Sequence, residues 1–273
     1  MQELIVQMEI PHSRWHGAIA RRRSRRRFDS AELESNLVDL LEAICKDFRP
    51  FSQARAQLVT RSPDTVFKGA VGPYGKIKGA PAYIAFIGDM DDPHIPEEIG
   101  YLGEGIILEA TAMGLATCWV GGFFRPKVAA SAVGTGGSER VFAVTPVGHA
   151  LAGFSAQERI MTGFGRSHRR KPLAELVTGL KEEDFPPWVK AALEAARLAP
   201  SAINRQPWRF QVTPESITVA VDNRRLDFGI STRLDCGIAM LHIEVAALDC
   251  GVQGRWEPLE APKVARFIVT AEK

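Results

Sequence analysis

Two stretches of the chain carry the same helical pattern and end in the same way. From Ile99 to Met113 apolar residues recur every three to four positions, and the pattern stops at Gly114-Leu115. From Asp235 to Leu248 the pattern is repeated, and it stops at Gly251-Val252. A glycine after an amphipathic helix favours a left-handed C-cap, so both stretches are expected to be helices in equivalent places. Two such units within 273 residues predict a duplicated fold in one polypeptide.

The segments between these helices alternate between short helical and strand patterns. Further helices are expected near 31–48, 126–132 and 188–198, and strands near 57–60, 82–87, 141–147 and 217–221. Asp29 or Ser30 is available to cap the first of these helices. The strand at 82–87 is apolar throughout, which is typical of a strand buried on both faces. We take Gly105 and Gly237 as the equivalent opening glycines of the repeated helices.

Composition limits the class of protein. An apolar content of 45% supports a sizeable core, and a formal net charge of +2 does not indicate a nucleic-acid binder. The four cysteines form no CxxC pair and no cluster with the six histidines, so we expect reduced thiols, no metal site and a cytoplasmic location. The apolar runs fit neither a secretory signal nor a membrane span, so no membrane partner is expected.

Two motifs about 180 residues apart carry the chemistry. The first is Arg22-Arg23-Ser24-Arg25-Arg26-Arg27-Phe28. Guanidinium groups match phosphate oxygens, although a solvated basic turn or a nucleic-acid patch would use the same residues. The second is Ala199-Pro200-Ser201-Ala202-Ile203-Asn204-Arg205-Gln206-Pro207-Trp208-Arg209-Phe210. Together the motifs resemble those of the FMN-dependent nitroreductase family, and in particular its single-chain branch of duplicated, pseudo-dimeric TM nitroreductases.

The resemblance implies an α+β fold with the three-layer α-β-α arrangement of nitroreductases, present as two degenerate halves. Residues 1–179 are expected to form the half with the phosphate motif, and residues 180–273 a shorter half that supplies the second motif. Family members are usually two-fold dimers with two flavins at the interface, so duplication predicts a monomeric pseudo-dimer rather than a homodimer. Phe51 to Val59, the counterpart of the second motif, lacks its proline, asparagine and tryptophan, so we expect one FMN per chain.

The resemblance also implies which residues hold the flavin phosphate. The family positions for this task are occupied by Arg22, Arg23, Ser24 and Arg26. A family arginine that returns to the phosphate corresponds to Arg170 in the closing segment RRKPL, where Arg169 or Lys171 could take the role instead.

At the flavin ring, the resemblance implies contacts from Pro200, Ser201 and Asn204 of the second half. An asparagine amide both donates and accepts, which suits the polar edge of the ring. Gly121 and Gly122 stand where the family offers backbone N–H groups to the flavin, and a residue without a side chain lets the backbone approach closely. The alternatives are that Pro200 ends a helix, Asn204 caps a turn and the glycines form an ordinary loop.

Other residues near these motifs have two interpretations. Lys76 falls where a family lysine would stabilise the negative charge of the reduced ring, whereas an upstream family asparagine is replaced by Pro73. Trp119 could line the ring but fits the core better. His242 is expected to be a satisfied or surface histidine, and Cys118 a small buried hydrophobe.

The implied function is an FMN-dependent NAD(P)H oxidoreductase. NADH or NADPH would reduce the flavin and leave, and a nitroaromatic, quinone or similar electron-poor acceptor would reoxidise it, with ping-pong kinetics. No catalytic side chain is expected, and without a GxGxxG motif the electron donor must share the flavin pocket. Two alternatives stay open: a flavin-binding or storage protein without turnover, and a nucleic-acid binder acting through Arg21 to Arg27.

Overall fold

The computed structural model describes residues 8–61, 63–67, 77–153, 169–222 and 229–270. The helices are α1 (His12–Arg21), α2 (Ser35–Asp47), α3 (Asp64–Phe67), α4 (Ile95–Ala112), α5 (Pro126–Val133), α7 (Leu173–Leu176), α8 (Pro187–Leu198) and α9 (Thr232–Asp249), with short 3₁₀ turns at η1 (Glu182–Asp184) and η2 (Ala202–Asn204). The strands are β1 (Ala54–Val59), β2 (Ala82–Asp89), β3 (Ala116–Thr117), β4 (Glu139–Gly148), β5 (Val177–Gly179), β6 (Trp208–Thr213), β7 (Ser216–Val221), β8 (Gly254–Pro258) and β9 (Lys263–Val269). Lys76 and Pro73 lie outside the described residues.

The first half is built on a four-stranded antiparallel sheet in the order β1-β2-β4-β3. Successive side chains of a strand point to opposite faces. In β2, Ile84 and its even-numbered neighbours pack with α2 and α4, whereas Ile87 and its odd-numbered neighbours pack with α3 and α5. Helices therefore cover both faces, which confirms the three-layer arrangement and the prediction of a doubly buried strand.

The second half contains a five-stranded sheet in the order β5-β6-β7-β9-β8, in which β5 is parallel to β6 and the other pairs are antiparallel. Strand β6 alternates between Trp208 and Phe210, which are buried with α8 and α9, and Arg209 and Gln211, which are accessible. In the described part of this half the helices therefore lie on one face of the sheet.

The two halves share one topology. Apart from α1, α3, α5, α7, β5 and the 3₁₀ turns, each half runs helix, strand, strand, helix, strand, strand. The order β1-β2-β4-β3 corresponds strand for strand to β6-β7-β9-β8. Helices α4 and α9 both have 18 residues and end in the same way. The N–H of Leu115 donates to Ala110, as that of Val252 donates to Ala247, and Gly114 and Gly251 have φ of +85° and +76°. The expected left-handed glycine caps are confirmed.

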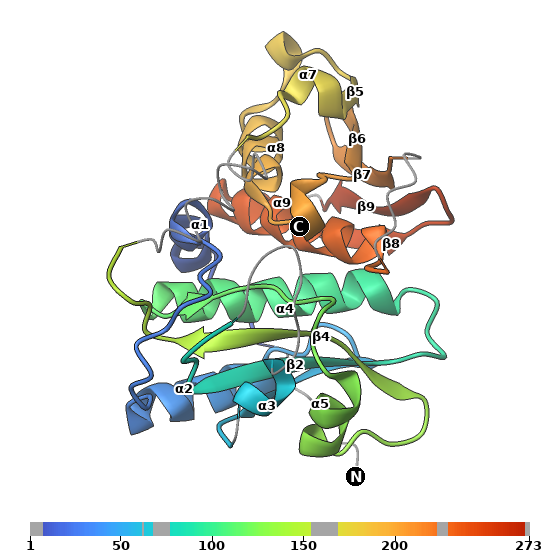
Figure 1. Cartoon of the computed structure of the whole chain (residues 1–273). Helices are drawn as coiled ribbons and strands as arrows, with labels where there is room; N and C mark the ends of the chain where they lie inside the picture. The colour runs from blue at the N-terminus through green and yellow to red at the C-terminus, as the bar shows by residue number, and fades with distance from the viewer. Residues whose placement is uncertain (1–7, 62, 68–76, 154–168, 223–228, 271–273) are drawn as a thin grey trace.

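Helices α4 and α9 cross at a reciprocal contact between glycines and backbone, with α4 lying between the first sheet and α9 (Figure 1). A Cβ on Gly100 would lie closer than 3.0 Å to the carbonyl oxygen of Leu234, and one on Gly237 would clash equally with the carbonyl of Glu97. Since Glu97 precedes Gly100 by three residues, as Leu234 precedes Gly237, the crossing has approximate two-fold symmetry. The equivalent of Gly237 is therefore Gly100, and the expected equivalence with Gly105 is wrong.

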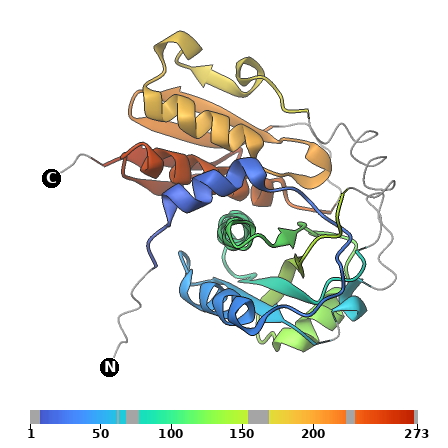
Figure 2. The same ribbon diagram turned by 90° about the vertical axis from the view of Figure 1, so that its left-hand side faces the viewer.

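Gly105 has a different task, because a Cβ there would clash with the rings of Phe48 and Trp15. Helix α1, which the sequence patterns did not predict, brings Trp15 to this position and lies between the two halves (Figure 2). Helix α4 contains three glycines, so the sequence alone does not show which of them is equivalent to Gly237. Only the crossing of the two helices identifies it as Gly100.

The start of α2 also differs from the prediction. This helix begins at Ser35, and its N-cap residue Glu34 makes no side-chain capping bond. Asp29 and Ser30 are not caps: Asp29 accepts a hydrogen bond from the N–H of Ala31 at 2.9 Å, and Ser30 has φ of +66°. They form a turn that ends the basic segment before the helix begins.

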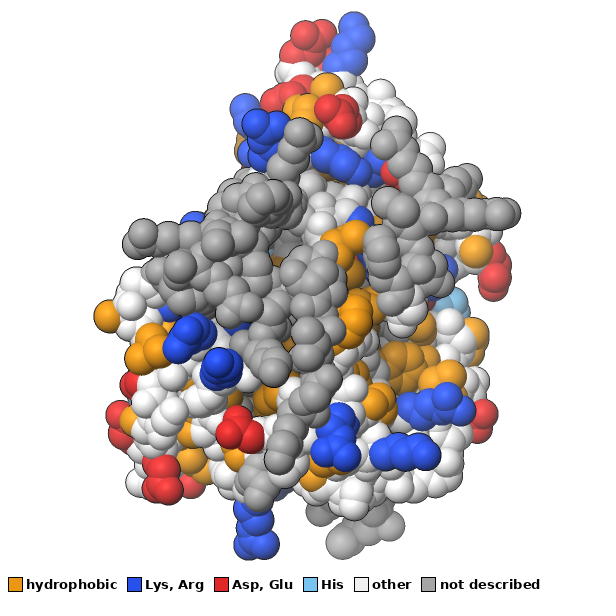
Figure 3. Space-filling model, viewed as in Figure 1, with side chains coloured by type: hydrophobic (Ala, Val, Ile, Leu, Met, Phe, Trp, Pro, Cys, Tyr) orange, Lys and Arg blue, Asp and Glu red, His pale blue; other side chains and the backbone are white. Residues whose placement is uncertain are grey.

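The surface view in Figure 3 shows Lys and Arg side chains among Asp and Glu ones, and not one continuous basic face, on the part of this side that the structure describes. Hydrophobic side chains cross the middle of the same face. Within the described ranges, none of the helices is both long and apolar enough to cross a membrane. The described residues also include no group of three or more His, Cys, Asp or Glu placed to hold a metal ion.

Candidate functional site

The segment from Arg22 to Phe28 runs from the end of α1 across the first sheet. Ser24 forms a bridge with Thr117, and the N–H of Arg25 donates to the carbonyl of Thr117 at 2.9 Å. Further along, the N–H of Lys78 donates to the carbonyl of Arg26 at 3.0 Å. Phe28 is buried and anchors the far end. The backbone of the first motif is therefore fixed at several points on one edge of the first half.

Positive charge gathers where this segment meets the closing basic segment of residues 169–173. Burial, together with the nearby charges of Arg22, Arg23 and Arg197, lowers the pKa of Arg170 to about 10. Arg22 is 7% exposed, and its Nε and Nη1 have no hydrogen-bond partner among the described residues. Its Nε lies 3.6 Å from Oε1 of Glu104, beyond hydrogen-bond distance. Such a cluster is electrostatically unfavourable unless an anion joins it.

Arg170 also joins the first motif to the second. Its Nη1 donates to Oδ1 of Asn204 at 2.5 Å and its Nη2 to the carbonyl of Leu198 at 3.2 Å, while Nδ2 of Asn204 donates to the carbonyl of Arg169 at 2.9 Å. Lys171 instead directs its Nζ to the carbonyls of Arg205 and Gln206. The charges of Arg22 and Arg23 in the first motif act on Arg170 and help to lower its pKa.

The loop after α8 has an unusual backbone. Ile203, Asn204 and Gln206 have φ of 51°, 57° and 49°, in the left-handed region that β-branched and bulky residues avoid. Each costs about 1 kcal/mol or more, and such residues persist only where surrounding contacts impose them. Ser201 supplies one contact, because its Oγ accepts from the N–H of Gln206 at 3.0 Å. Pro200 follows the helix end at Leu198 and also fits a helix terminator.

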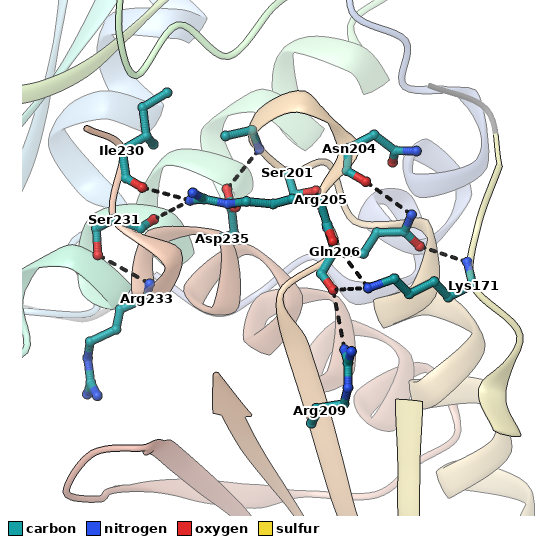
Figure 4. A network of polar contacts seen from close by, with 11 residues as sticks. Lys171, Ser201, Asn204, Arg205, Gln206, Arg209, Ile230, Ser231, Arg233 and Asp235 are labelled. Atoms are coloured by element: carbon teal, nitrogen blue, oxygen red, sulfur yellow. Dashed lines mark hydrogen bonds and ion pairs between the residues drawn. The ribbon is translucent and has the colours of Figure 1, made fainter. Parts of the chain in front are cut away.

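A buried ion pair imposes the rest of this conformation (Figure 4). Arg205 and Asp235 have side chains 5% and 2% exposed, with Nε 2.6 Å from Oδ2. The same carboxylate accepts from the N–H of Ala202 at 3.1 Å, and Arg205 donates to the carbonyls of Ile230 and Ser231. Burial raises the pKa of Asp235 to about 6, and these donors keep it ionised at neutral pH. The second motif is thereby tied to the start of α9.

The Gly-Gly turn reaches the second motif through Ile230. A Cβ on Gly121 would lie 3.1 Å from Cγ2 of Ile230, and one on Gly122 would lie 3.5 Å from its Cδ1. The carbonyl of Ile230 accepts from Arg205, so both segments meet the same residue. Next to the glycines, Phe123 is 53% exposed and has φ of 58°.

Sequence reasoning missed a buried polar cluster beside Arg22. Glu104 is fully buried, accepts from Nε1 of Trp119 at 2.7 Å, and lies 3.0 Å from Nε2 of His242. The other ring nitrogen of His242 lies 2.8 Å from the carbonyl of Ala195, which confirms that this histidine is satisfied. The sequence did contain a signal for this cluster, because Glu104 and His242 each stand within a helical pattern of mostly apolar residues. Arg205 and Asp235 were missed in the same way.

Fold and site together define a single-chain, duplicated nitroreductase-like protein with a cationic cluster where its halves meet. The chain belongs to the family described as "Putative TM nitroreductase", whose model matches residues 16–247. Its structure is similar to a protein of Thermotoga maritima MSB8 described as a putative nitroreductase, over 97% of each chain, with 20% identity and a TM-score of 0.65.

Shorter structures match about half of the chain. A nitroreductase family protein of Clostridium difficile 630 aligns with 58% of this chain and 94% of its own, at 19% identity and a TM-score of 0.44. A nitroreductase with bound FMN from Bacteroides fragilis NCTC 9343 aligns with 52% of this chain and 90% of its own, at 14% identity and a TM-score of 0.41. No curated protein matches the sequence significantly.

Proposed function

We propose that this protein is an FMN-dependent NAD(P)H oxidoreductase that uses a nitroaromatic, quinone or similar electron-poor acceptor. The observation that carries the proposal is the cluster of Arg22, Arg23 and Arg170, in which a guanidinium that is 7% exposed has two nitrogens without hydrogen-bond partners among the described residues. A phosphate monoester carries nearly two negative charges and accepts charge-assisted hydrogen bonds from guanidinium. FMN is a ligand that supplies such a group.

The residues beside the cluster fit the remainder of FMN. The amide of Asn204 accepts from Arg170 and donates to the carbonyl of Arg169, so the second motif lies next to the phosphate end. Gly121 and Gly122 present backbone without side chains close to Ile230, where a planar ring needs close approach. We assign phosphate binding to Arg22, Arg23, Ser24, Arg26 and Arg170. We assign contacts with the flavin ring to Lys76, Gly121, Gly122, Pro200, Ser201 and Asn204.

When bound, FMN would supply hydride transfer from NADH or NADPH to the acceptor in two half-reactions. The chain itself would hold the phosphate by charge, keep the second motif in one strained conformation through Arg205 and Asp235, and leave one side open to the donor and the acceptor in turn. No side chain acts as an acid or base in this proposal, because the cofactor carries the chemistry.

We also propose one FMN per chain and a monomer, since the symmetry-related location lacks the same parts. Val120 lies six residues after the cap glycine Gly114, as Glu257 lies six residues after Gly251, and Glu257 pairs with β9 as Val120 pairs with β4. Pro258 and Leu259 therefore stand where the first half has its two glycines. The connection from α2 to β1 is also shorter than the connection at 199–207 that carries the second motif. We therefore propose that residues 1–179 and 180–273 are unequal halves that build a single site, with β5 at the end of the first added to the sheet of the second beside β6.

The experiment is to saturate the purified protein with FMN, desalt it, quantify flavin per chain by absorption, and add NADH or NADPH without oxygen. One flavin that bleaches and recovers its colour with a quinone supports the proposal. One flavin that stays oxidised with both donors would identify a storage protein instead. Retention of no flavin would overturn the assignment of the site, and two flavins per chain would refute the single-site model.

A further inference from the structure

One buried carboxylate, that of Glu104 in α4, lies beside the first motif and is linked through one or two side chains to the segments that lead into the Gly-Gly turn and the second motif. Its Oε1 lies 3.6 Å from Nε of Arg22, in the first motif. Its Oε2 accepts from Trp119 at 2.7 Å, two residues before the Gly-Gly turn. Its Oε1 also lies 3.0 Å from His242 of α9, whose other nitrogen faces the carbonyl of Ala195 in α8, the helix that leads into the second motif.

The hydrogen bonds indicate that Glu104 is charged. The carbonyl of Ala195 only accepts, so Nδ1 of His242 carries a proton. Nε2 of the same ring lies 3.0 Å from Oε1 of Glu104. Trp119 donates to the carboxylate and Arg22 lies beside it, and both interactions stabilise a negative charge on Glu104. A carboxylate held in this way is a fixed negative charge inside the protein.

Arg22 needs such a charge to stay where it is. Its backbone N–H donates to the carbonyl of Ala18 at the end of α1, which fixes the main chain but not the guanidinium. The guanidinium is almost completely buried, and its charge and that of Arg170 repel each other. A buried charge without a partner is strongly unfavourable, so without Glu104 the side chain of Arg22 would turn outward to water.

We propose that Glu104 is a positioning residue that holds Arg22 in the cluster and thereby sets the affinity of the site for the phosphate of its ligand; this inference rests on the proposed function. The carboxylate lies beyond hydrogen-bond distance of Nε of Arg22, so it orients the guanidinium by charge and leaves Nη1 without a hydrogen-bond partner among the described residues. Trp119 and His242 hold Glu104 in turn. The network therefore links the phosphate end to both segments that approach the flavin ring.

Helix α4 supplies a matched control in Glu109. This second buried glutamate, 3% exposed, also accepts from a tryptophan, Trp15, at 2.7 Å and pairs with an arginine, Arg14. Glu109 is a glutamate in the same helix as Glu104 and is also buried, but it contacts α1 away from the first motif. If FMN binding is weakened in both Glu104→Gln and Glu109→Gln, the cause is a change in folding. If it is weakened only in Glu104→Gln, the cause lies in the site.

The experiment titrates the full-length apoprotein with FMN and with riboflavin, which lacks the phosphate, and follows quenching of flavin fluorescence. Wild type should prefer FMN. In Glu104→Gln the Kd for FMN should rise about tenfold, the equivalent of one charge-assisted hydrogen bond, while the Kd for riboflavin changes by less than about twofold. Glu109→Gln should keep the wild-type ratio of the two dissociation constants.

A double variant shows whether Glu104 acts through Arg22. In the Arg22→Ala background, Glu104→Gln should not change the Kd for FMN relative to that for riboflavin any further. If Glu104→Gln does not fold, Trp119→Phe removes one donor to the carboxylate and keeps an aromatic ring, and it should raise the Kd for FMN relative to that for riboflavin about threefold. If the Kd for FMN relative to that for riboflavin did not change, the inference would be overturned. Tighter FMN binding would also overturn it, because that result is expected if Glu104 only competes with the phosphate. A wild type that binds neither flavin would refute the proposed function itself.

Discussion

Replacing Gly237 with alanine is expected to destabilise the protein by about 2 kcal/mol, because the added methyl group would meet backbone and not a movable side chain. In the structure a Cβ at this position lies within 3.0 Å of three main-chain atoms of Glu97. Ordinary contact begins at 3.4 Å, so α4 and α9 would have to separate by roughly 1 Å or more. Gly100→Ala should have nearly the same effect, because the crossing is reciprocal.

The magnitude follows from two opposing terms. Overpacking a well-packed contact costs about 1 to 3 kcal/mol, and an obstacle made of backbone places this case at the upper end. Alanine in a helix is better than glycine by about 1 kcal/mol, which offsets part of the loss. For a chain of this size, 2 kcal/mol corresponds to a decrease in Tm of about 4 to 8 °C.

The assay is urea unfolding followed by circular dichroism, with Gly17→Ala as the control. Gly17 lies within α1, and nothing lies within 4 Å of its added Cβ. Gly17→Ala should therefore stabilise the protein by about 0.5 to 1 kcal/mol through helix propensity alone. If Gly237→Ala were as stable as wild type, or were stabilised like the control, the close crossing of α4 and α9 would be wrong.

Three further predictions concern charged residues. Arg22→Ala combined with Arg26→Ala should weaken FMN binding about 100-fold or more, since each charge-assisted bond contributes about 1.5 to 3 kcal/mol, and full flavin occupancy after desalting would contradict the phosphate assignment. Asp235→Asn should cost about 3 kcal/mol in urea unfolding, because it leaves a buried guanidinium without its counter-charge; a loss below about 1 kcal/mol would show that the ion pair does not hold the second motif. Burial, with help from Asp92 and Glu97, raises the pKa of Glu98 from 4.5 to about 7, so its ionisation is easier in the unfolded chain and wild type loses stability as pH rises through this range. After allowance for solvent screening, Glu98→Gln should therefore be more stable than wild type by about 1 kcal/mol at pH 8 and unchanged at pH 4, and a gain at both values would point to packing instead.

The sequence alone determined the helices α2, α4, α5, α8 and α9 and the strands β1, β2, β4 and β7. Periodicity and glycine caps depend on residues within one or two turns, so the helices ending at Gly114 and Gly251 and the doubly buried strand β2 were predicted correctly. Strands β8 and β9 and helix α1 were not predicted, because their patterns are short or mixed and their form depends on the surfaces against which they pack. The family was also evident from two short motifs, since such motifs keep their residue types.

Tertiary structure alone decided how the halves meet. Whether Gly100 or Gly105 matches Gly237 depends on the crossing of two helices, which no local pattern records. The same holds for Glu104, which belongs to α4 by its local pattern but reaches Arg22 and His242 only once three helices are packed. Local sequence determines the conformation of a segment, whereas the partners of a buried charge are set by contacts between residues distant in the chain, and the candidate site consists of such contacts.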